Sequence, residues 1–376
     1  MLSKQNLSAP LFETFTLGNM TLSNRIVMAP MTRNQSPGGV PTEDVAAYYK
    51  SRAVGGVGLI ITEGTYIDHL GANGYPGVPA FYGEQALAGW KRVVEEVHAA
   101  GGKIAPQLWH VGRERRPGVE PDTSVPGFGP MSIVEDGVEV VRAMSEDDMH
   151  EVAASFARAA SDAKRIGFDG IELHGAHGYL IDQFFWAESN QRTDTFGGSA
   201  ENRLRFPRMI VSAVREAVGP EFPIMFRFSQ WKLSDYDAII AETPDALGEI
   251  LKPLADDGVD IFHASTRRVW EPGFEGSDKT LATWTRELTG KPVIAVGSVG
   301  LDKTFRTGHF TRTEDPTSKS RVNVEELAMW RARDDFDLIA IGRALLSDPQ
   351  WANKVRDGRL DELSDFDSSA LDTLVR

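Results

Sequence analysis

The chain has 376 residues, of which 41% are hydrophobic and 25% are charged, and this composition is that of a globular protein with a large core. Its formal net charge of −14 repels phosphate backbones and anionic lipid surfaces, so we expect neither a nucleic-acid partner nor a membrane partner. The absence of cysteine excludes disulfides, thiolate metal sites and thiol catalysis. No basic and apolar leader opens the chain and no window approaches the ~20 apolar residues that span a bilayer, so we expect a cytoplasmic protein.

The first predicted element is a β-hairpin over Leu11–Leu22, which turns at Gly18-Asn19. Short apolar runs follow it, and most are continuously apolar, as expected for strands that are covered on both faces in a parallel sheet. The eight runs are Arg25–Pro30, Val57–Glu63, Lys103–Trp109, Asp169–His174, Pro223–Ser229, Val259–Ser265, Pro292–Gly297 and Asp337–Gly342.

Longer segments with helical features separate these runs, and Thr42 and Ser145 are candidate N-caps. The helical segments are Thr42–Ala53, Gly83–Ala100, Ser145–Ile166, Ala200–Val218, Thr243–Asp257 and Val324–Arg333. Eight strand–helix repeats favour a closed (β/α)8 TIM barrel over a doubly wound sheet. We therefore predict one α/β domain over residues 1–376, with the hairpin at the barrel bottom. Three long loops should project from the C-terminal face: His110–Met144, Thr266–Thr283 and Leu301–Asn323, the last as a gate.

Polar residues stand at the ends of the predicted strands, where TIM barrels place their chemistry. In chain order these ends carry Pro30-Met31-Thr32, Glu63-Gly64, Gln107–His110, His174, Arg227, His263, Gly297-Ser298 and Gly342-Arg343. Because a buried unpaired donor or charge is costly, such groups need partners in the barrel mouth. The alternative is a chance set of core polar groups, each satisfied separately. A glutamine, an arginine and a histidine at three separate strand tips favour a functional cavity.

The last two strands end in glycine-containing turns, Gly297-Ser298-Val299-Gly300 and Gly342-Arg343. Glycines there let backbone N–H groups approach an anion, and this is the position of the phosphate site that many barrels form. The alternative is two tight turns with a surface arginine. The run Gly55-Gly56-Val57-Gly58 precedes a strand, whereas a dinucleotide fingerprint follows one, so we predict no Rossmann module.

Two histidines and a tyrosine share one turn after the fourth run, in His174-Gly175-Ala176-His177-Gly178-Tyr179. A histidine pair at this spacing could bind a metal, but no third ligand is evident and no HExxH pattern exists, so we expect no metal. The alternative with more support is a pair of N–H donors aimed at one oxygen, with Tyr179 as an acid. Satisfied core histidines are the remaining interpretation.

Three stretches together resemble the Old Yellow Enzyme family, the FMN-dependent ene reductases. They are Asn24–Arg33 (NRIVMAPMTR), Gln107–Arg113 (QLWHVGR) and His174–Arg203, and the resemblance runs from Leu11 to Arg356. It implies a tightly bound, non-covalent FMN and NAD(P)H as a transient hydride donor. The end of the sixth strand, the length of the loop Leu301–Asn323 and the acidic tail depart from the best-known members, and these departures bear on substrate range, nicotinamide preference and oligomeric state.

The resemblance also implies roles for the residues that hold the flavin. Pro30, Met31 and Gly64 would contact the flavin ring, and Thr32 would donate to the carbonyl near N5. Gln107 would read the pyrimidine edge. Arg227 would lie beside N1 and O2, where reduced flavin is negatively charged. The phosphate would lie at Gly297, Ser298, Gly342 and Arg343, and His174 is also counted among the cofactor-binding residues.

For the substrate, the resemblance implies that His174 and His177 hold the electron-withdrawing group and that Tyr179 protonates carbon. Tyr75 and Trp109 would line the pocket, and we add Trp270, from the loop after the sixth strand. The expected reaction is hydride transfer from NAD(P)H through FMN N5 to the β carbon of an α,β-unsaturated carbonyl or nitro compound. The alternatives are reduction of nitrate esters or nitro groups, a flavin-free phosphate-binding lyase or isomerase, and a non-enzymatic flavin sensor. We expect a small-molecule substrate and a monomer or homodimer.

Overall fold

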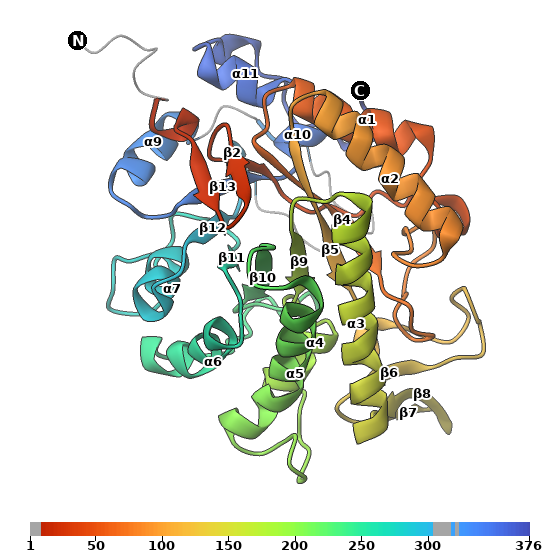
Figure 1. Ribbon diagram of the computed structural model, residues 1–376. Coiled ribbons are helices and arrows are strands. Elements are labelled where there is room, and N and C mark those ends of the chain that lie inside the picture. The colour runs from red at the N-terminus through yellow and green to blue at the C-terminus, as the bar shows by residue number, and fades with distance from the viewer. Residues whose placement is uncertain (1–8, 304–316, 320–322) are drawn as a thin grey trace.

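The computed structural model describes residues 9–303, 317–319 and 323–376, and its centre is a closed barrel of eight parallel strands (Figure 1). In chain order the strands are β3 (Ile26–Met28), β4 (Leu59–Tyr66), β5 (Lys103–Trp109), β9 (Ile171–His174), β10 (Ile224–Ser229), β11 (Ile261–Ser265), β12 (Val293–Val296) and β13 (Leu338–Ile341). Each lies in one of the eight predicted runs, although β4 continues three residues further, to Tyr66. The predicted TIM barrel is confirmed.

Helices cover the outside of the barrel (Figure 1). Their bounds are α1 (Glu43–Val54), α2 (Glu84–Ala99), α3 (Glu146–Ile166), α4 (Leu180–Phe185), α5 (Ala200–Val218), α6 (Pro244–Asp256), α7 (Leu281–Thr289), α9 (Val324–Ala332), α10 (Ala344–Ser347) and α11 (Trp351–Arg356). Both predicted N-caps are confirmed, because Thr42 accepts from Val45 N and Ser145 forms a reciprocal capping box with Asp148. Within the described residues, no helix combines the length and the apolar character needed to cross a bilayer.

The hairpin closes the bottom of the barrel, as predicted. Strands β1 (Phe15–Leu17) and β2 (Met20–Leu22) pair antiparallel, and Asn19 N donates to the carbonyl of Glu221, just before β10. Met20 and Leu22 pack on the inward-facing side chains of the strands, which fill the lower barrel: Val27, Ala29, Leu59, Ile61, Ala105, Met225, Ile261, Ile294, Leu338 and Ala340. The interior is therefore a packed core below and is available for polar groups only near the top.

Two of the predicted loops contain regular structure. His110–Met144 folds into a small sheet of β6 (Gly127–Gly129), β7 (Ile133–Glu135) and β8 (Val138–Ala143). The sequence did not predict these strands because all three are short and none has an apolar signature: β6 is buried but reads Gly-Phe-Gly, and β7 and β8 are largely exposed. Thr266–Thr283 ends early, because Thr280 caps α7. Most of the proposed gate, Leu301–Asn323, lies outside the described residues.

The capping box at the start of α3 gives a local stability prediction. Ser145→Ala removes the acceptor for Asp148 N, so the first turn of α3 should open more easily, by about 1 kcal/mol. Amide hydrogen exchange at Asp148 measures this free energy directly. Ser145→Asp, which retains an acceptor, is the matched control, and exchange at the Ser199-capped start of α5 should not change. Equal exchange in Ser145→Ala and the parent protein would contradict the prediction.

Candidate active site

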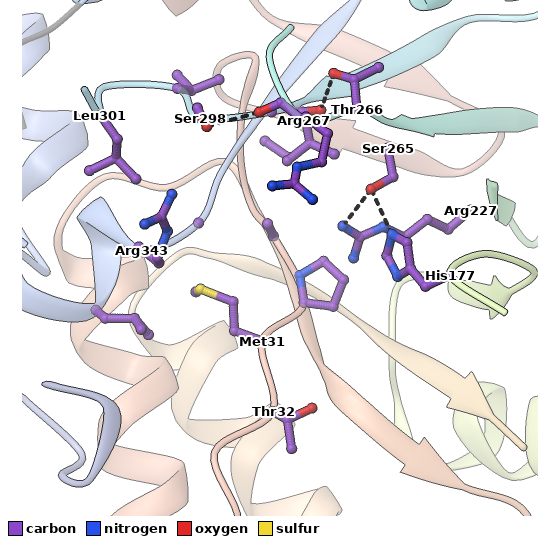
Figure 2. A pocket seen from close by; sticks show the side chains of 18 of the residues that line it. Met31, Thr32, His177, Arg227, Ser265, Thr266, Arg267, Ser298, Leu301 and Arg343 are labelled. Atoms are coloured by element: carbon purple, nitrogen blue, oxygen red, sulfur yellow. Dashed lines mark hydrogen bonds between the residues drawn. The ribbon is translucent and has the colours of Figure 1, made fainter. Parts of the chain in front are cut away.

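A cavity of about 280 Å³ opens at the carboxyl ends of the strands, and most predicted cofactor residues line it (Figure 2). These are Pro30, Met31, Thr32, Arg227, Gly297, Ser298, Gly342 and Arg343, together with His177. They come from five separate strand ends, and barrel closure brings them together. Six other predicted residues do not line this cavity but lie in the structure around it. They are Gly64, Gln107, His174, Tyr179, Trp109 and Tyr75.

One end of the cavity is built for an anion. Ser298, with φ of +47°, follows β12 and donates its hydroxyl to the carbonyl of Arg267 at 2.8 Å. Arg343 follows β13 and donates to the carbonyl of Lys303 at 2.6 Å. Burial and the nearby charge of Arg267 lower the pKa of Arg343 to about 10, so the side chain is still cationic at neutral pH. Two guanidiniums beside two strand-end turns fit a phosphate group.

The other end presents Arg227 and His177 to the cavity, with Ser265 between them (Figure 2). Ser265 Oγ accepts from Arg227 at 3.3 Å and lies 2.8 Å from His177 Nε2. Arg227 Nε is buried and has no partner within the described structure. A buried cation with an unused donor fits the electron-rich pyrimidine end of a flavin, so the cavity matches FMN at both ends.

A register shift in β4 determines the structure beside Thr32 and Arg33, the residues that follow β3. The pairing of β4 with β5 slips between Ile61 and Gly64, so that Gly64 lies opposite Gln107. A Cβ at Gly64 would be 2.4 Å from the Trp109 ring, so only glycine fits there. Glu63 accepts from Arg33 N at 2.8 Å and thereby fixes the backbone just after Thr32. Burial raises the pKa of Glu63 to about 7.

The turn after β9 holds the remaining predicted site residues in one cluster of rings. His174 lies 5.2 Å from His177 and 5.0 Å from Tyr179, measured between ring centroids. Trp109 contacts Tyr179 at 4.8 Å and stacks on both His174 and Tyr75. The hydroxyls of Tyr75 and Tyr179 are 3.3 Å apart. The structure thus brings together five of the six residues that the sequence assigned to the substrate, and Trp270 is the exception.

The protonation states of this cluster follow from burial. Burial, and then the positive charge of Arg227, lower the pKa of His174 and of His177 well below the usual value, so both rings are neutral at neutral pH. Ala176 N donates to His174 Nδ1 at 3.4 Å, so the proton of His174 lies on Nε2. Burial raises the pKa of Tyr179 well above its usual value, so its hydroxyl keeps its proton. The cluster combines an N–H donor with a hydroxyl acid.

Comparison with known proteins assigns this arrangement to a family. Residues 10–309 match a family model described as the NADH:flavin oxidoreductase / NADH oxidase family. The chain belongs to this family. An NADH oxidase of Thermoanaerobacter brockii is 34% identical over 362 residues, 94% of this chain but 52% of the relative, so the chain spans about half of that protein. The 12-oxophytodienoate reductase 7 of Oryza sativa subsp. japonica is 40% identical over 371 residues, 93% of this chain and 88% of the relative.

Solved structures of the Old Yellow Enzyme group share the fold. Morphinone reductase in complex with tetrahydroNAD is 31% identical with a TM-score of 0.78, covering 96% of this chain and 93% of that chain. An Old Yellow Enzyme homologue from Zymomonas mobilis is 26% identical with the same TM-score of 0.78, covering 96% of each chain. The predicted Old Yellow Enzyme family, its class of nicotinamide-dependent flavin oxidoreductase and its FMN cofactor are confirmed.

The structure does not place Trp270, which the sequence assigned to the substrate pocket, with the other predicted residues. Its ring stacks on Trp330 of α9, with 5.9 Å between centroids, and it lines neither of the two described cavities. Trp231, which the sequence did not single out, lies closer, because it stacks on His177 at 4.4 Å. It lies after β10 in a polar loop whose pattern gave no signal. Trp231 and Arg267 also line a second, adjoining cavity of about 640 Å³.

A buried ion pair supports the turn that carries His174, His177 and Tyr179. Lys232 Nζ donates to both oxygens of Asp182, at 2.6 and 2.7 Å, and both side chains are fully buried. Asp182 also accepts from Gly178 N at 2.7 Å. Burial lowers the pKa of Lys232 and raises the pKa of Asp182, while each charge stabilises the other. The pair therefore anchors the backbone between His177 and Tyr179.

Glu63 gives a prediction about pH. Its pKa rises from 4.5 to about 7 on folding, so between these values the folded chain holds a proton that the unfolded chain has released. The contribution of Glu63 to the stability of the folded state is therefore fully present below pH 4.5 and should be lost, by roughly 3 kcal/mol in total, as the pH rises from there through 7. Glu63→Gln should lack this component in urea unfolding measured from pH 5 to 8. The exposed Glu249→Gln control should follow the parent protein, and parallel curves for all three proteins would contradict the prediction.

The ion pair gives a second prediction. Lys232→Met leaves the carboxylate of Asp182 buried without its cation, so unfolding should become easier by about 3–5 kcal/mol. The double variant Asp182→Asn, Lys232→Met removes both charges and retains an acceptor for Gly178 N, so it should lose less stability than Lys232→Met. Urea denaturation of the FMN-loaded proteins measures the difference. A double variant no more stable than the single one would show that the unpaired charge is not the cause.

Proposed function

We propose that this protein reduces activated carbon–carbon double bonds of α,β-unsaturated carbonyl or nitro compounds with hydride from NAD(P)H. The observation that carries the proposal is the convergence of the His174 N–H donor, His177 and the Tyr179 hydroxyl at one strand end beside the flavin cavity. A relative that covers most of this chain is named a 12-oxophytodienoate reductase, and a structural neighbour is named morphinone reductase, which supports reduction of a conjugated substrate.

The residues of the first cavity would hold FMN along its length. The phosphate would lie at Ser298 and Arg343, and the pyrimidine edge would lie near Gln107 and Arg227, because these ends supply the positive charge and the unused donor. The Thr32 hydroxyl would meet the carbonyl next to N5. FMN, when bound, would accept a hydride from the nicotinamide and give it to the substrate. One open face over the cavity would serve both ligands in turn, since the sequence contains no separate dinucleotide motif.

The histidines would bind the oxygen of the electron-withdrawing group. His174 offers Nε2–H, and both rings are neutral at neutral pH, so they polarise the oxygen without adding a full charge. Ser265 lies 2.8 Å from His177 Nε2 and thereby fixes the orientation of that ring. Donors that are already oriented in a buried site stabilise negative charge that develops on the oxygen during hydride addition at the β carbon.

Tyr179 would supply the proton that completes the reduction. Its hydroxyl is buried, retains its proton and contacts the Tyr75 hydroxyl at 3.3 Å, which holds it in place. Hydride at the β carbon and the Tyr179 proton at the α carbon together add two hydrogens across the double bond, and a proton from solvent then restores the Tyr179 hydroxyl. Such an acid contributes about 10²–10⁴-fold to a rate.

Stopped-flow kinetics of each half-reaction tests the proposed function. The FMN-loaded protein is reduced with NADH or NADPH and then mixed with an enone, a maleimide, a nitroalkene or a nitrate ester. We expect rapid reoxidation of the flavin by enones and nitroalkenes, with the saturated compound as the product. Reoxidation by nitrate esters alone would favour the nitrate-ester reductase alternative and contradict our proposal.

Tyr179→Phe tests the assignment of the acid. Flavin reduction by the nicotinamide needs no proton from the protein and should change little, whereas enone reduction should slow by about 10²-fold or more. Nitroalkenes should be less affected in hydride transfer, because the nitronate product is stable without immediate protonation. Tyr75→Phe is the matched control: it removes the neighbouring hydroxyl but leaves the acid, so the loss should be smaller. Equal slowing of both half-reactions in Tyr179→Phe would indicate a binding role instead.

A further inference from the structure

A layer of buried polar side chains lies between the packed barrel core and the flavin cavity. Glu172 of β9 is its centre: one carboxylate oxygen accepts from Gln107 Nε2 at 2.7 Å, and the other lies 2.6 Å from His263 Nδ1. Glu172 and His263 are fully buried, and Gln107 is 3% exposed. The contact with His263 crosses β10, which separates β9 from β11, whereas Gln107 lies opposite Glu172 on the neighbouring strand β5. A contact across an intervening strand shows that these side chains meet inside the barrel.

The carboxylate determines how its two neighbours are oriented. A carboxylate accepts and does not donate, so the group of Gln107 that faces Glu172 is the NH₂, and the amide oxygen is left for another donor. For the same reason His263 carries its proton on Nδ1. Its Nε2 is then an acceptor, and it is buried without a partner within the described structure. Glu172 thus fixes a pattern of donors and acceptors that neither neighbour fixes alone.

Glu172 also brings a carboxylate close enough to Arg227, which lines the cavity, for the two charges to interact. Arg227 pairs in register with His174 on one side and His263 on the other. The charged and titratable groups that interact electrostatically with His263 are Glu172 and Arg227, and its ring in turn acts on His174 and His177. At this end of the cavity the cation Arg227 and the anion Glu172 therefore act on each other and on the ring of His263.

We propose that Glu172 is a positioning residue for the flavin and sets its reduction potential. It would hold the amide oxygen of Gln107 toward the flavin N3–H and, through its charge, oppose the negative charge that the reduced cofactor gains near Arg227. The inference rests on the proposed placement of FMN in this cavity. Buried charges interact strongly because little water screens them, so the potential should respond to this single carboxylate.

Glu172→Gln is the direct test, because it keeps the shape and removes the charge. The variant amide no longer dictates the orientation of Gln107, so oxidised FMN should bind about tenfold more weakly, the loss of one oriented hydrogen bond. Reduced FMN loses the same hydrogen bond, but its negative charge no longer meets the negative charge of Glu172. These two effects oppose each other, so the affinity for reduced FMN should change little. The ratio of the two dissociation constants then changes about tenfold, which is about 30 mV upward for a two-electron couple. Fluorescence titration of the apoprotein and dye-linked redox titration measure the two quantities.

A merely structural role predicts another result, in which both redox states of FMN bind more weakly and the potential does not move. That outcome would overturn the proposal. His263→Asn is the conservative control, because its side-chain NH₂ can donate to Glu172 from the position of Nδ1, and it should keep the potential near that of the parent protein. A rise in potential equal to that of Glu172→Gln would also count against the charge of Glu172 as the cause.

Two further measurements keep the test decisive. Arg343→Met alters the phosphate end only: if it weakens FMN binding while Glu172→Gln changes nothing, the role of Glu172 is overturned and the FMN site stands. If neither variant affects FMN binding, the placement of FMN is overturned instead.

If Glu172→Gln fails to fold, ¹⁵N-histidine NMR of the parent holoprotein tests the proposal without a variant. It should show His263 neutral with its proton on Nδ1, and a proton on Nε2 would overturn the proposal.

Discussion

The closure of eight parallel strands into one barrel is the constraint on which this structure depends. In a closed parallel sheet the carboxyl ends of all strands lie on one rim, so the order of the strands alone makes neighbours of residues that are far apart in the chain. Arg227 and His177 share Ser265 for this reason, although the three lie on different strand ends. At the opposite end, apolar side chains of the strands fill the lower interior and the hairpin packs on them, which restricts polar groups to the top.

Burial then determines the chemistry of those polar groups. The same loss of water that keeps His174 and His177 neutral keeps the hydroxyl of Tyr179 protonated, because a charged form of either group is costly in a dry site. The charges that do occur there are balanced in two ways: Asp182 forms an ion pair with Lys232, and Arg227 interacts electrostatically with Glu172. The site therefore combines neutral donors and an acid with a buried ion pair behind them and a cation, Arg227, in the cavity wall.

Buried side chains outside the cavity hold the backbone of the site in place by specific hydrogen bonds. Gly178, between His177 and Tyr179, is held by the carboxylate of Asp182, and the backbone after Thr32 is held by Glu63. Both carboxylates are buried and neither lines the cavity. They fix backbone rather than touch a ligand, and this is how a loop at a barrel rim can present side chains in a fixed geometry.

The sequence by itself determined the local features of this protein. The eight strands, the hairpin, the caps at Thr42 and Ser145 and the strand-end residues all follow from short-range pattern, because apolar runs and capping chemistry depend on neighbours in the chain. Its motifs also identified the family. Only the tertiary structure placed Glu172 against His263, moved Gly64 opposite Gln107, brought Trp231 onto His177 and left Trp270 beside Trp330. A charged residue inside an apolar strand was a signal for Glu172, but its partner lies across an intervening strand, and that contact exists only once the barrel has closed.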